Sequence, residues 1–133
     1  MPALPWTKTG TPEPDAVLTV MASRLPLRSH RDLPRFFRHT WLVRRQLLRS
    51  PGLVGFSLDA HPLGKTFWTV SAWSSRPDLG AFDRSGPHGA AKAAIRPTMR
   101  PSTFVMWTCH PEDLPISWDE VRERIAAVAT RGS

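Results

Sequence analysis

His88 is the residue of this sequence whose type and position are best suited to chemistry. Ser85-Gly86-Pro87 precedes it, and this order predicts a helix whose first turn carries the histidine, because serine and glycine favour the cap and proline the first turn. The partial positive charge of a helix N-terminus disfavours imidazolium, so we expect a neutral ring near pH 7. Neutral imidazole can accept a proton, hydrogen-bond a phenol or ligate haem iron, and it can equally be a structural side chain.

Arg44 is the second candidate. The helix predicted after Asp32 carries one apolar face, formed by Leu33, Phe36, Phe37, Thr40, Trp41, Leu47 and Leu48. At about 100° per residue, Arg44 falls within that face. A guanidinium there stays charged and must find a carboxylate, a carbonyl or an anionic ligand. Arg44 could therefore anchor a substrate anion, or it could extend past a strand edge to solvent or pair with an acidic residue such as Asp59.

Aromatic side chains form the third candidate set. The chain has six tryptophans and six phenylalanines but no tyrosine, so it has no phenol for acid–base work. Aromatic walls suit flat polycyclic ligands or haem, and they suit a plain core or a subunit contact equally well. Those expected to bind substrate are Phe37, Trp41, Trp68, Phe82 and Trp107. Trp68 and Trp73 are an odd number of residues apart on one predicted strand, so they should face opposite sides of the sheet.

Several motifs with well-defined chemistry are missing from the sequence. It has no GxGxxG segment, P-loop, HExxH motif or GxSxG elbow, and its one cysteine excludes an internal disulfide. The five histidines are too scattered to indicate a zinc site. Flavin and nicotinamide cofactors therefore have no local support. Oxygen chemistry would have to be cofactor-free, relying on the electron-rich ring of the substrate, or based on haem.

Short strands and helices must position these candidates. The sequence predicts strands over 16–23, 53–60, 65–73 and 102–109, the middle two joined as a hairpin. Helices are predicted from Pro34 to about Ser50, over 78–84 and 88–95, and after Ser117, whose spacing to Glu120 indicates a capping box. Residues 1–14, with four prolines, predict a flexible or extended lead-in. Residues 15–133 then form a single domain.

The predicted order β-α-β-β-α-β with a further C-terminal helix indicates an α+β domain of the ferredoxin-like type. In that arrangement a four-stranded antiparallel sheet carries helices on one face, and its other face needs a cover. Because large bare apolar faces are uncommon on monomers, we expect a homodimer that buries this face.

The segments RRQLLRSPGLVGFSL, FWTVSAW and SGPH with its alanine-rich continuation resemble the antibiotic-biosynthesis-monooxygenase superfamily. Within it, they resemble an actinobacterial branch distantly similar to spheroidene monooxygenase. The resemblance covers about residues 16–109 and implies a dimeric α+β barrel, in which two sheets pack together. It also implies a monooxygenase of specialised metabolism that acts on an aromatic or polyketide-like small molecule. His88 would be the base or axial ligand and Arg44 the anion anchor. The cofactor-free, quinone-forming members use an Asn/Trp pair, whereas this chain has no asparagine.

Positive charge is concentrated in one part of the chain. Residues 24–49 hold eight arginines against Asp32 alone, a difference of seven that equals the net charge of +7. Such a run is either a solvated helix face or a surface for an anionic partner, such as an acidic carrier protein. Two other functions stay open. One is a non-oxidative cyclase, isomerase or dehydratase on the same scaffold, and the other is a non-catalytic module that binds an acidic partner through residues 31–49.

Location and partners follow from composition. No apolar run approaches the length of a membrane span, and the N-terminus lacks the pattern of a signal peptide. A single cysteine is consistent with a reducing compartment. We therefore expect a cytoplasmic protein that binds a small-molecule substrate and a second copy of itself, with neither a membrane nor a nucleic acid as partner.

Overall fold

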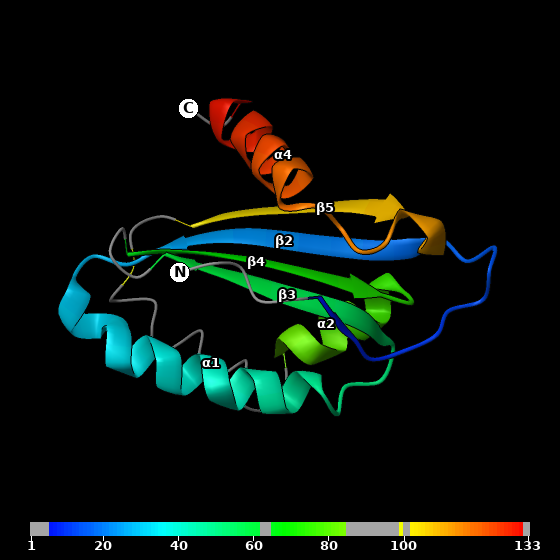
Figure 1. The fold of residues 1–133 in the computed structure, drawn as a ribbon, viewed down its shortest axis with the longest axis horizontal. Coiled ribbons are helices and arrows are strands. Elements are labelled where there is room, and N and C mark those ends of the chain that lie inside the picture. Colours follow the sequence, from blue (N-terminus) through cyan, green and yellow to red (C-terminus); the bar gives the residue numbers. More distant parts are fainter. Residues whose placement is uncertain (1–5, 62–64, 85–98, 100–101, 132–133) are drawn as a thin grey trace.

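The computed structural model describes residues 6–61, 65–84, 99 and 102–131. Its strands are β1 (Thr7–Lys8), β2 (Leu18–Pro26), β3 (Leu53–His61), β4 (Thr66–Trp73) and β5 (Thr103–Cys109) (Figure 1). Its helices are α1 (Leu33–Leu47), α2 (Arg76–Arg84) and α4 (Trp118–Arg131), with 3₁₀ turns η1 (His30–Asp32) and η3 (Pro111–Asp113). The helix predicted over 88–95 lies outside the described residues. No helix in the described part of the chain is long and apolar enough to cross a membrane.

The strands form one antiparallel sheet in the order β1-β3-β4-β2-β5. The four strands predicted from the sequence are β2 to β5, and they have the ferredoxin-like order, in which β2 pairs with both β4 and β5. The segment assigned to the lead-in supplies a fifth strand, because Thr7 pairs with Phe56 and Lys8 with Gly55 along β3. A Cβ at position 55 would overlap the indole of Trp6, so glycine allows this segment to approach. The fold is α+β, with five strands instead of four.

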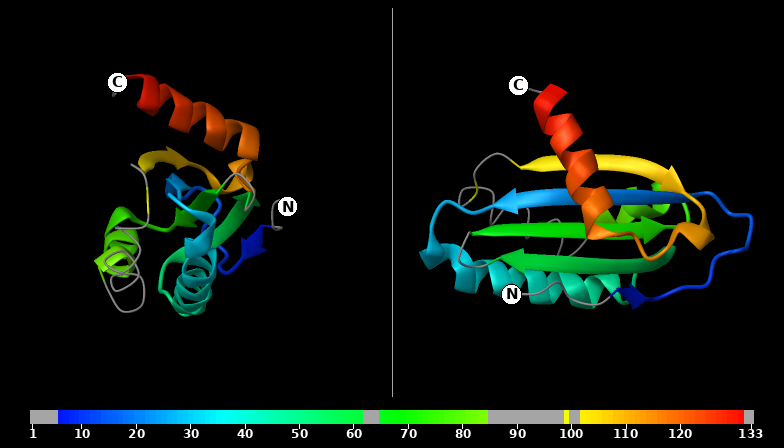
Figure 2. Two further views of the ribbon diagram at one scale, coloured as in Figure 1. Left: turned by 90° about the vertical axis from the view of Figure 1, so that its left-hand side faces the viewer. Right: turned by 45° about the horizontal axis from the view of Figure 1, so that its top comes forward.

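Side-chain alternation divides the sheet into two faces. Helices α1 and α2 lie side by side on one, which we call the α1 face, and α4 crosses the other, the α4 face (Figure 2). Along β2, Val20 and Ala22 belong to the α4 face, whereas Met21 belongs to the α1 face. The face that we expected to be bare is therefore covered by a helix of the same chain.

The α4 face holds one continuous apolar core. Val121 and Ile125 of α4 and Ile116 before it are buried against the strands. The strand residues of this core include Leu18, Val20, Ala22, Val70 and Ala72. Burial of the leucine, isoleucine and valine side chains among them stabilises a fold by about 1.5–3 kcal/mol each. A bare apolar face is thus not a reason for dimerisation here, and the homodimer itself stays a prediction.

The α1 face, in contrast, holds two separate apolar clusters. In one, Phe36 of α1 packs on Phe67 of β4 with ring centroids 4.2 Å apart. In the other, Trp73 of β4 packs on Phe82 of α2 with centroids 5.2 Å apart. Between the two clusters, the strand positions on β2 and β4 hold serine and threonine.

Helix α1 begins with Pro34 in its first turn and ends at Leu47, near its predicted bounds. Its predicted burial is partly wrong. Phe37, Trp41 and Leu48 are 39%, 58% and 47% exposed, because a helix rests only a stripe of roughly 100° on a sheet. Leu42, which helical spacing puts outside the predicted apolar face, is half-buried.

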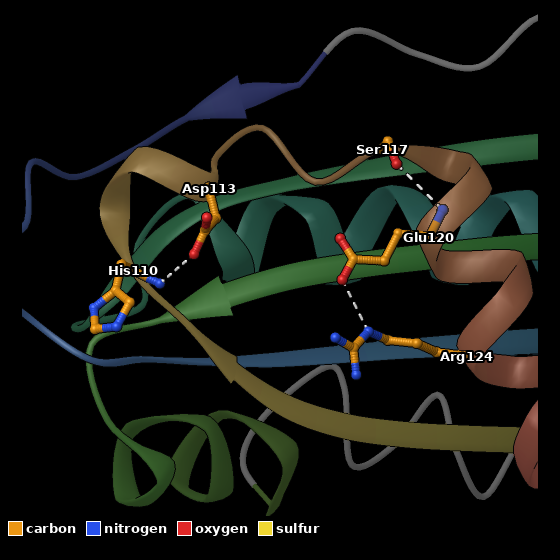
Figure 3. Close-up of polar contacts among 5 residues, drawn as sticks. All are labelled: His110, Asp113, Ser117, Glu120 and Arg124. Atoms are coloured by element: carbon orange, nitrogen blue, oxygen red, sulfur yellow. Dashed lines mark hydrogen bonds and ion pairs between the residues drawn. The ribbon is translucent and has the colours of Figure 1, made fainter.

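Polar caps fix the chain between β5 and α4 (Figure 3). The carboxylate of Asp113 accepts a hydrogen bond from the backbone N–H of His110 at 2.8 Å, and the Ser117 hydroxyl accepts one from the backbone N–H of Glu120 at 3.2 Å. The second contact confirms Ser117 as the cap of α4. One turn later, Arg124 Nε donates to the Glu120 carboxylate at 2.9 Å.

Candidate functional site

A band of hydroxyl side chains lies on the α1 face between its two apolar clusters. We call Ser23 of β2 together with Thr69 and Ser71 of β4 the hydroxyl band. The strand register sets Ser23 opposite Thr69, and their hydroxyl oxygens are hydrogen-bonded. Ser71 lies two residues further along β4 and therefore on the same face. Its hydroxyl accepts a hydrogen bond of 2.9 Å from the indole Nε1 of Trp73.

Helix α1 also has a polar residue at the level of the hydroxyl band. Its inward positions follow steps of three or four residues, at Phe36, Thr40, Val43 and Leu47. Phe36 belongs to one apolar cluster, and Val43 and Leu47 belong to the other. Thr40 therefore falls at the level of the gap between the clusters. Hydroxyls from the helix and from the strands coincide in the same part of the α1 face.

Burying the hydroxyl band in the core costs free energy unless its hydroxyls are hydrogen-bonded. Ser23 is 2% exposed, and a buried hydroxyl without a partner costs about 1–3 kcal/mol. Every buried side-chain nitrogen or oxygen in the described part of the chain has a partner, so the band is satisfied. Serine and threonine also fill less volume than the leucine or phenylalanine of the flanking clusters. Thr69 and Ser71 are only half-buried, and each hydroxyl has hydrogen-bonding positions beyond the contacts described above.

The band has an apolar border at β5. The register sets Phe104 opposite Ser23 and Met106 opposite Met21, so both lie on the α1 face. Phe104 and Met106 are 54% and 44% exposed, which is high for large apolar side chains. Apolar side chains next to a few convergent hydroxyls suit a ligand with an aromatic body and polar oxygen atoms.

Two of the aromatic residues predicted to bind substrate lie on the opposite side of the sheet. Trp68 and Trp107 pack against the core of the α4 face. Arginines of α4 lie over them, with Arg122 at 5.4 Å from the Trp68 ring centroid and Arg124 at 4.5 Å from that of Trp107. Trp73 packs under the other helices, so the prediction that Trp68 and Trp73 face opposite sides is confirmed.

The other three aromatic residues are also separated. Phe82 of α2 is buried on Trp73 and so borders the hydroxyl band. Phe37 has an edge contact with Phe67, with centroids 5.5 Å apart, and Trp41 is largely exposed. The five aromatic side chains therefore do not line one wall, and Phe82 is the one that adjoins the hydroxyl band.

Arg44 lies at the sheet edge. Its side chain is exposed, with the guanidinium carbon 6.0 Å from the ring centroid of Phe56. Gln46, about 200° around the helix from Arg44, donates to the backbone carbonyl of Phe82 in α2 at 3.3 Å. Arg44 is therefore on the flank of α1 that faces away from α2. This placement favours the interpretation in which Arg44 extends past a strand edge to solvent. His88 lies outside the described residues, so its role as base or axial ligand stays a prediction.

A buried charge lies on the α4 face. Asp59 is buried and pairs with Arg122 of α4 and with Nε2 of His61, the latter at 3.1 Å. Cys109 is also buried there, and desolvation by burial raises the pKa of its thiol to about 11, with smaller contributions from Asp113 and Glu120. Its thiol is therefore protonated near neutral pH. These groups belong to the packing of α4 and do not adjoin the hydroxyl band.

The hydroxyl band suits a neutral organic ligand. Among the described residues, no group of three or more His, Cys, Asp or Glu side chains could hold a metal ion. The band supplies hydroxyls, which match the oxygen atoms of phenols and ketones. Haem needs an axial side chain such as histidine, and the band itself supplies none. His39, two turns before Gln46 on the same flank of α1, is a half-buried titratable side chain that the sequence did not single out.

Sequence reasoning missed the hydroxyl band. A signal exists in the alternation, because Thr19 and Ser23 of β2 and Thr69 and Ser71 of β4 occupy one face of their strands. The pattern of one strand does not show that Ser23 lies opposite Thr69. That pairing depends on the register between two strands that are 46 residues apart in sequence.

No protein-family model and no curated protein matches the sequence of this chain. Solved structures do match its fold. A protein of Nitrosomonas europaea assigned to the antibiotic biosynthesis monooxygenases matches with a TM-score of 0.62 at 17% identity, over 69% of this chain and 89% of that one. SnoaB, a cofactor-independent oxygenase of Streptomyces nogalater, matches with 0.59 at 15% identity, over 75% and 99%. LmHde, a haem-degrading enzyme of Listeria monocytogenes, matches with 0.61 at 17% identity, over 83% and 70%.

At these identities the likeness concerns the fold, since one fold can carry many activities. It agrees with the element order and the sheet topology described above. This chain therefore has the α+β ferredoxin-like fold of antibiotic-biosynthesis-monooxygenase-like proteins.

Proposed function

We propose that this protein is a monooxygenase-like enzyme of specialised metabolism that binds an aromatic or polyketide-like small molecule at the hydroxyl band. The observation that carries the proposal is the interruption of the apolar core on the α1 face by Ser23, Thr69 and Ser71, at the level of Thr40. The fold likeness to SnoaB and to the Nitrosomonas protein supports the reaction class.

The hydroxyl band would bind and orient a planar ligand. Serine and threonine hydroxyls donate to carbonyl oxygens and accept from phenols. Trp73 and Phe82 are buried beside Ser71, whereas Phe104 and Met106 form an exposed apolar border beside Ser23 and Met21. A fused ring system lying along the band would bury its rings against Phe104 and Met106 while its oxygen atoms meet the hydroxyls.

Proton transfer needs a further group, because serine and threonine hydroxyls do not take up protons near neutral pH. His88 is the proposed base. His39, on the flank of α1 that faces α2, is a second candidate from the described part of the chain. Removing a proton from a phenol or enol raises the electron density of the ring. The ring can then reduce O₂, with one oxygen atom entering the product and the other leaving as water.

A non-oxidative cyclase, isomerase or dehydratase is the second candidate. The lack of asparagine favours it, because the cofactor-free oxygenases that the sequence resembles use an Asn/Trp pair. The same hydroxyls and a histidine base would support the enolisation steps of such reactions.

Oxygen consumption with a hydroxylated anthrone as probe tests the proposal. Oxygenation of the ring methylene gives the anthraquinone and water, with one O₂ consumed per product. The double variant Ser23→Ala/Thr69→Val removes both partners of a buried hydrogen bond, so stability should change little, whereas a lost ligand bond should lower kcat/KM about tenfold. Thr103→Val, on the α4 face of β5, is the matched control and should leave kcat/KM unchanged.

The outcomes separate the candidates. Product formation without O₂ uptake would favour the non-oxidative enzyme. A double variant with the kcat/KM of the wild type would remove the hydroxyl band as the site.

Two histidine variants identify the base. If His88 is the base, kcat/KM falls as the pH drops through its pKa, His88→Ala abolishes this dependence, and His39→Ala keeps it. The reverse pattern would assign the base to His39. A Soret band in the wild type that His88→Ala loses would indicate a haem ligand instead. Unchanged rates and spectra in both variants would move the function to the acidic-partner module.

A further inference from the structure

An apolar stripe lies exposed along α1. It consists of Phe37, Trp41 and Leu48, and we call it the aromatic stripe. The three residues recur at steps of four and seven, so they share one side of the helix. Trp41 is the most exposed of them, and it has no ring contact or hydrogen bond with another described residue. Tryptophan is one of the side chains most enriched at protein interfaces, so an exposed tryptophan indicates a contact surface.

The aromatic stripe is distinct from the proposed substrate site. Trp41 and Leu48 belong to neither apolar cluster of the α1 face. The stripe lies on the same flank as Arg44, which faces away from α2, whereas Gln46 reaches α2 from the opposite flank. Helix α1 runs along the outer edge of the molecule (Figure 1), so a partner could reach this flank without disturbing the sheet.

Arginines border the aromatic stripe on both sides. Arg44 lies on the side toward the sheet, and Arg38 and Arg45 lie on the side toward solvent, about 40–60° around the helix from Trp41. All three are exposed, and none forms an ion pair with a described residue. Helix α1 contains no Asp or Glu between Leu33 and Leu47. Among the described residues, the charges next to the stripe are therefore positive.

We infer that the aromatic stripe docks an acidic amphipathic helix of a partner protein. The partner helix would present apolar side chains to Trp41. On one side of them its carboxylates would pair with Arg44, and on the other side with Arg38 and Arg45. Tryptophan and arginine dominate the hot spots of protein interfaces, and lysine, which α1 lacks, is depleted there. A second copy of this chain would oppose arginine to arginine, so like-charge repulsion disfavours it as the occupant.

A designed pair of peptides tests this inference. The first is an 18-residue fluorescein-labelled helix with leucine along one face and glutamate on both sides of it. The second has the same composition in an order without an amphipathic face. Fluorescence anisotropy at low salt should show the first peptide binding at least tenfold more tightly than the second. Trp41→Ala should weaken its binding about 30-fold, and Arg38→Glu/Arg45→Glu about 100-fold. Arg76→Glu reverses the charge of an exposed arginine on α2, outside the stripe, and as a control it should have little effect.

The other results would contradict the inference or assign the surface to another partner. Equal affinity for the two peptides would mean non-specific charge attraction, and equal affinity in wild type and Trp41→Ala would remove the aromatic stripe. The inference would also be overturned if the first peptide did not bind at 100 µM. This concentration is about tenfold above the weakest Kd of interest. A different result would be that the protein binds neither peptide but sediments with vesicles of phosphatidylcholine and phosphatidylglycerol, and that Trp41→Ala abolishes this sedimentation. That result would assign the surface to a lipid headgroup layer. Circular dichroism of each variant confirms that α1 is folded.

Discussion

Replacing Arg122 by methionine should loosen α4 from the sheet. The Asp59 carboxylate that Arg122 binds is 5% exposed, whereas Arg122 itself is 37% exposed. Removing one member of a fully buried ion pair costs about 3–5 kcal/mol, but solvent screens a half-exposed partner. His61 also keeps its contact with Asp59 at 3.1 Å. We therefore expect a loss of about 2 kcal/mol, which includes the contacts of the guanidinium with Trp68 and Trp118.

Urea denaturation measures this loss. A domain of this size unfolds with an m-value of about 2 kcal/mol/M, so the midpoint of Arg122→Met should fall by about 1 M. Arg124→Met is the matched control on the same helix. Its partner Glu120 is 40% exposed, and exposed pairs contribute about 0–1 kcal/mol. Arg124 also lies 4.5 Å from the Trp107 ring centroid, so this variant loses a ring contact as Arg122→Met does. Its midpoint should fall by about 0.5 M in total, half the fall expected for Arg122→Met.

A double variant tests the physical cause. In Asp59→Leu/Arg122→Met no buried charge is left without a partner, so most of the lost stability should return. The reasoning fails if Arg122→Met behaves like Arg124→Met. It also fails if the double variant is less stable than Arg122→Met alone.

Three further predictions concern reactivity, charge and assembly. Because burial raises the pKa of the Cys109 thiol to about 11, its reaction with a disulfide reagent should speed up about tenfold per pH unit up to that value; rapid labelling of the folded protein at pH 7 would contradict this. Arg44→Met should keep both the urea midpoint and the kcat/KM, since its guanidinium reaches solvent; a fall of tenfold or more in kcat/KM would restore its role as anion anchor. For the homodimer, sedimentation at micromolar concentration should give a species of about 30 kDa, twice the 14.9 kDa of one chain; a single monomer species would remove the barrel.

The order of the elements was predictable because each local signal agreed with the fold. Pro34 marked the start of α1, Ser117 capped α4, and alternation in 53–60 and 65–73 predicted the β3–β4 hairpin. The positions of those elements in space were less predictable. The apolar side chains of α4 are as compatible with a partner subunit as with the free face of the sheet, and the sequence does not distinguish the two.

The candidate site was less predictable than the fold. Helical spacing placed Trp41 on the apolar face of α1, but the buried stripe is narrower than that face, and Trp41 lies outside it. Trp68, Phe82 and Trp107 were predicted to bind one substrate, although Trp68 and Trp107 belong to one side of the sheet and Phe82 to the other. The composition gives the side chains that the chain contains. Which of them lie next to one another depends on the register between strands.

The unequal cores of the two faces have a consequence for how the molecule opens. Local unfolding proceeds in cooperative units whose free energy depends on the apolar contacts that hold them. Residues 116–125 share one continuous cluster with the central strands, so α4 and β2 should exchange their amide protons only near global unfolding. Helix α1 rests on two smaller clusters with hydroxyls between them, so it forms a separate unit of lower free energy. A ligand could then enter through fluctuations of α1 that leave the rest of the domain folded, and its binding would be visible as slower exchange in α1 alone.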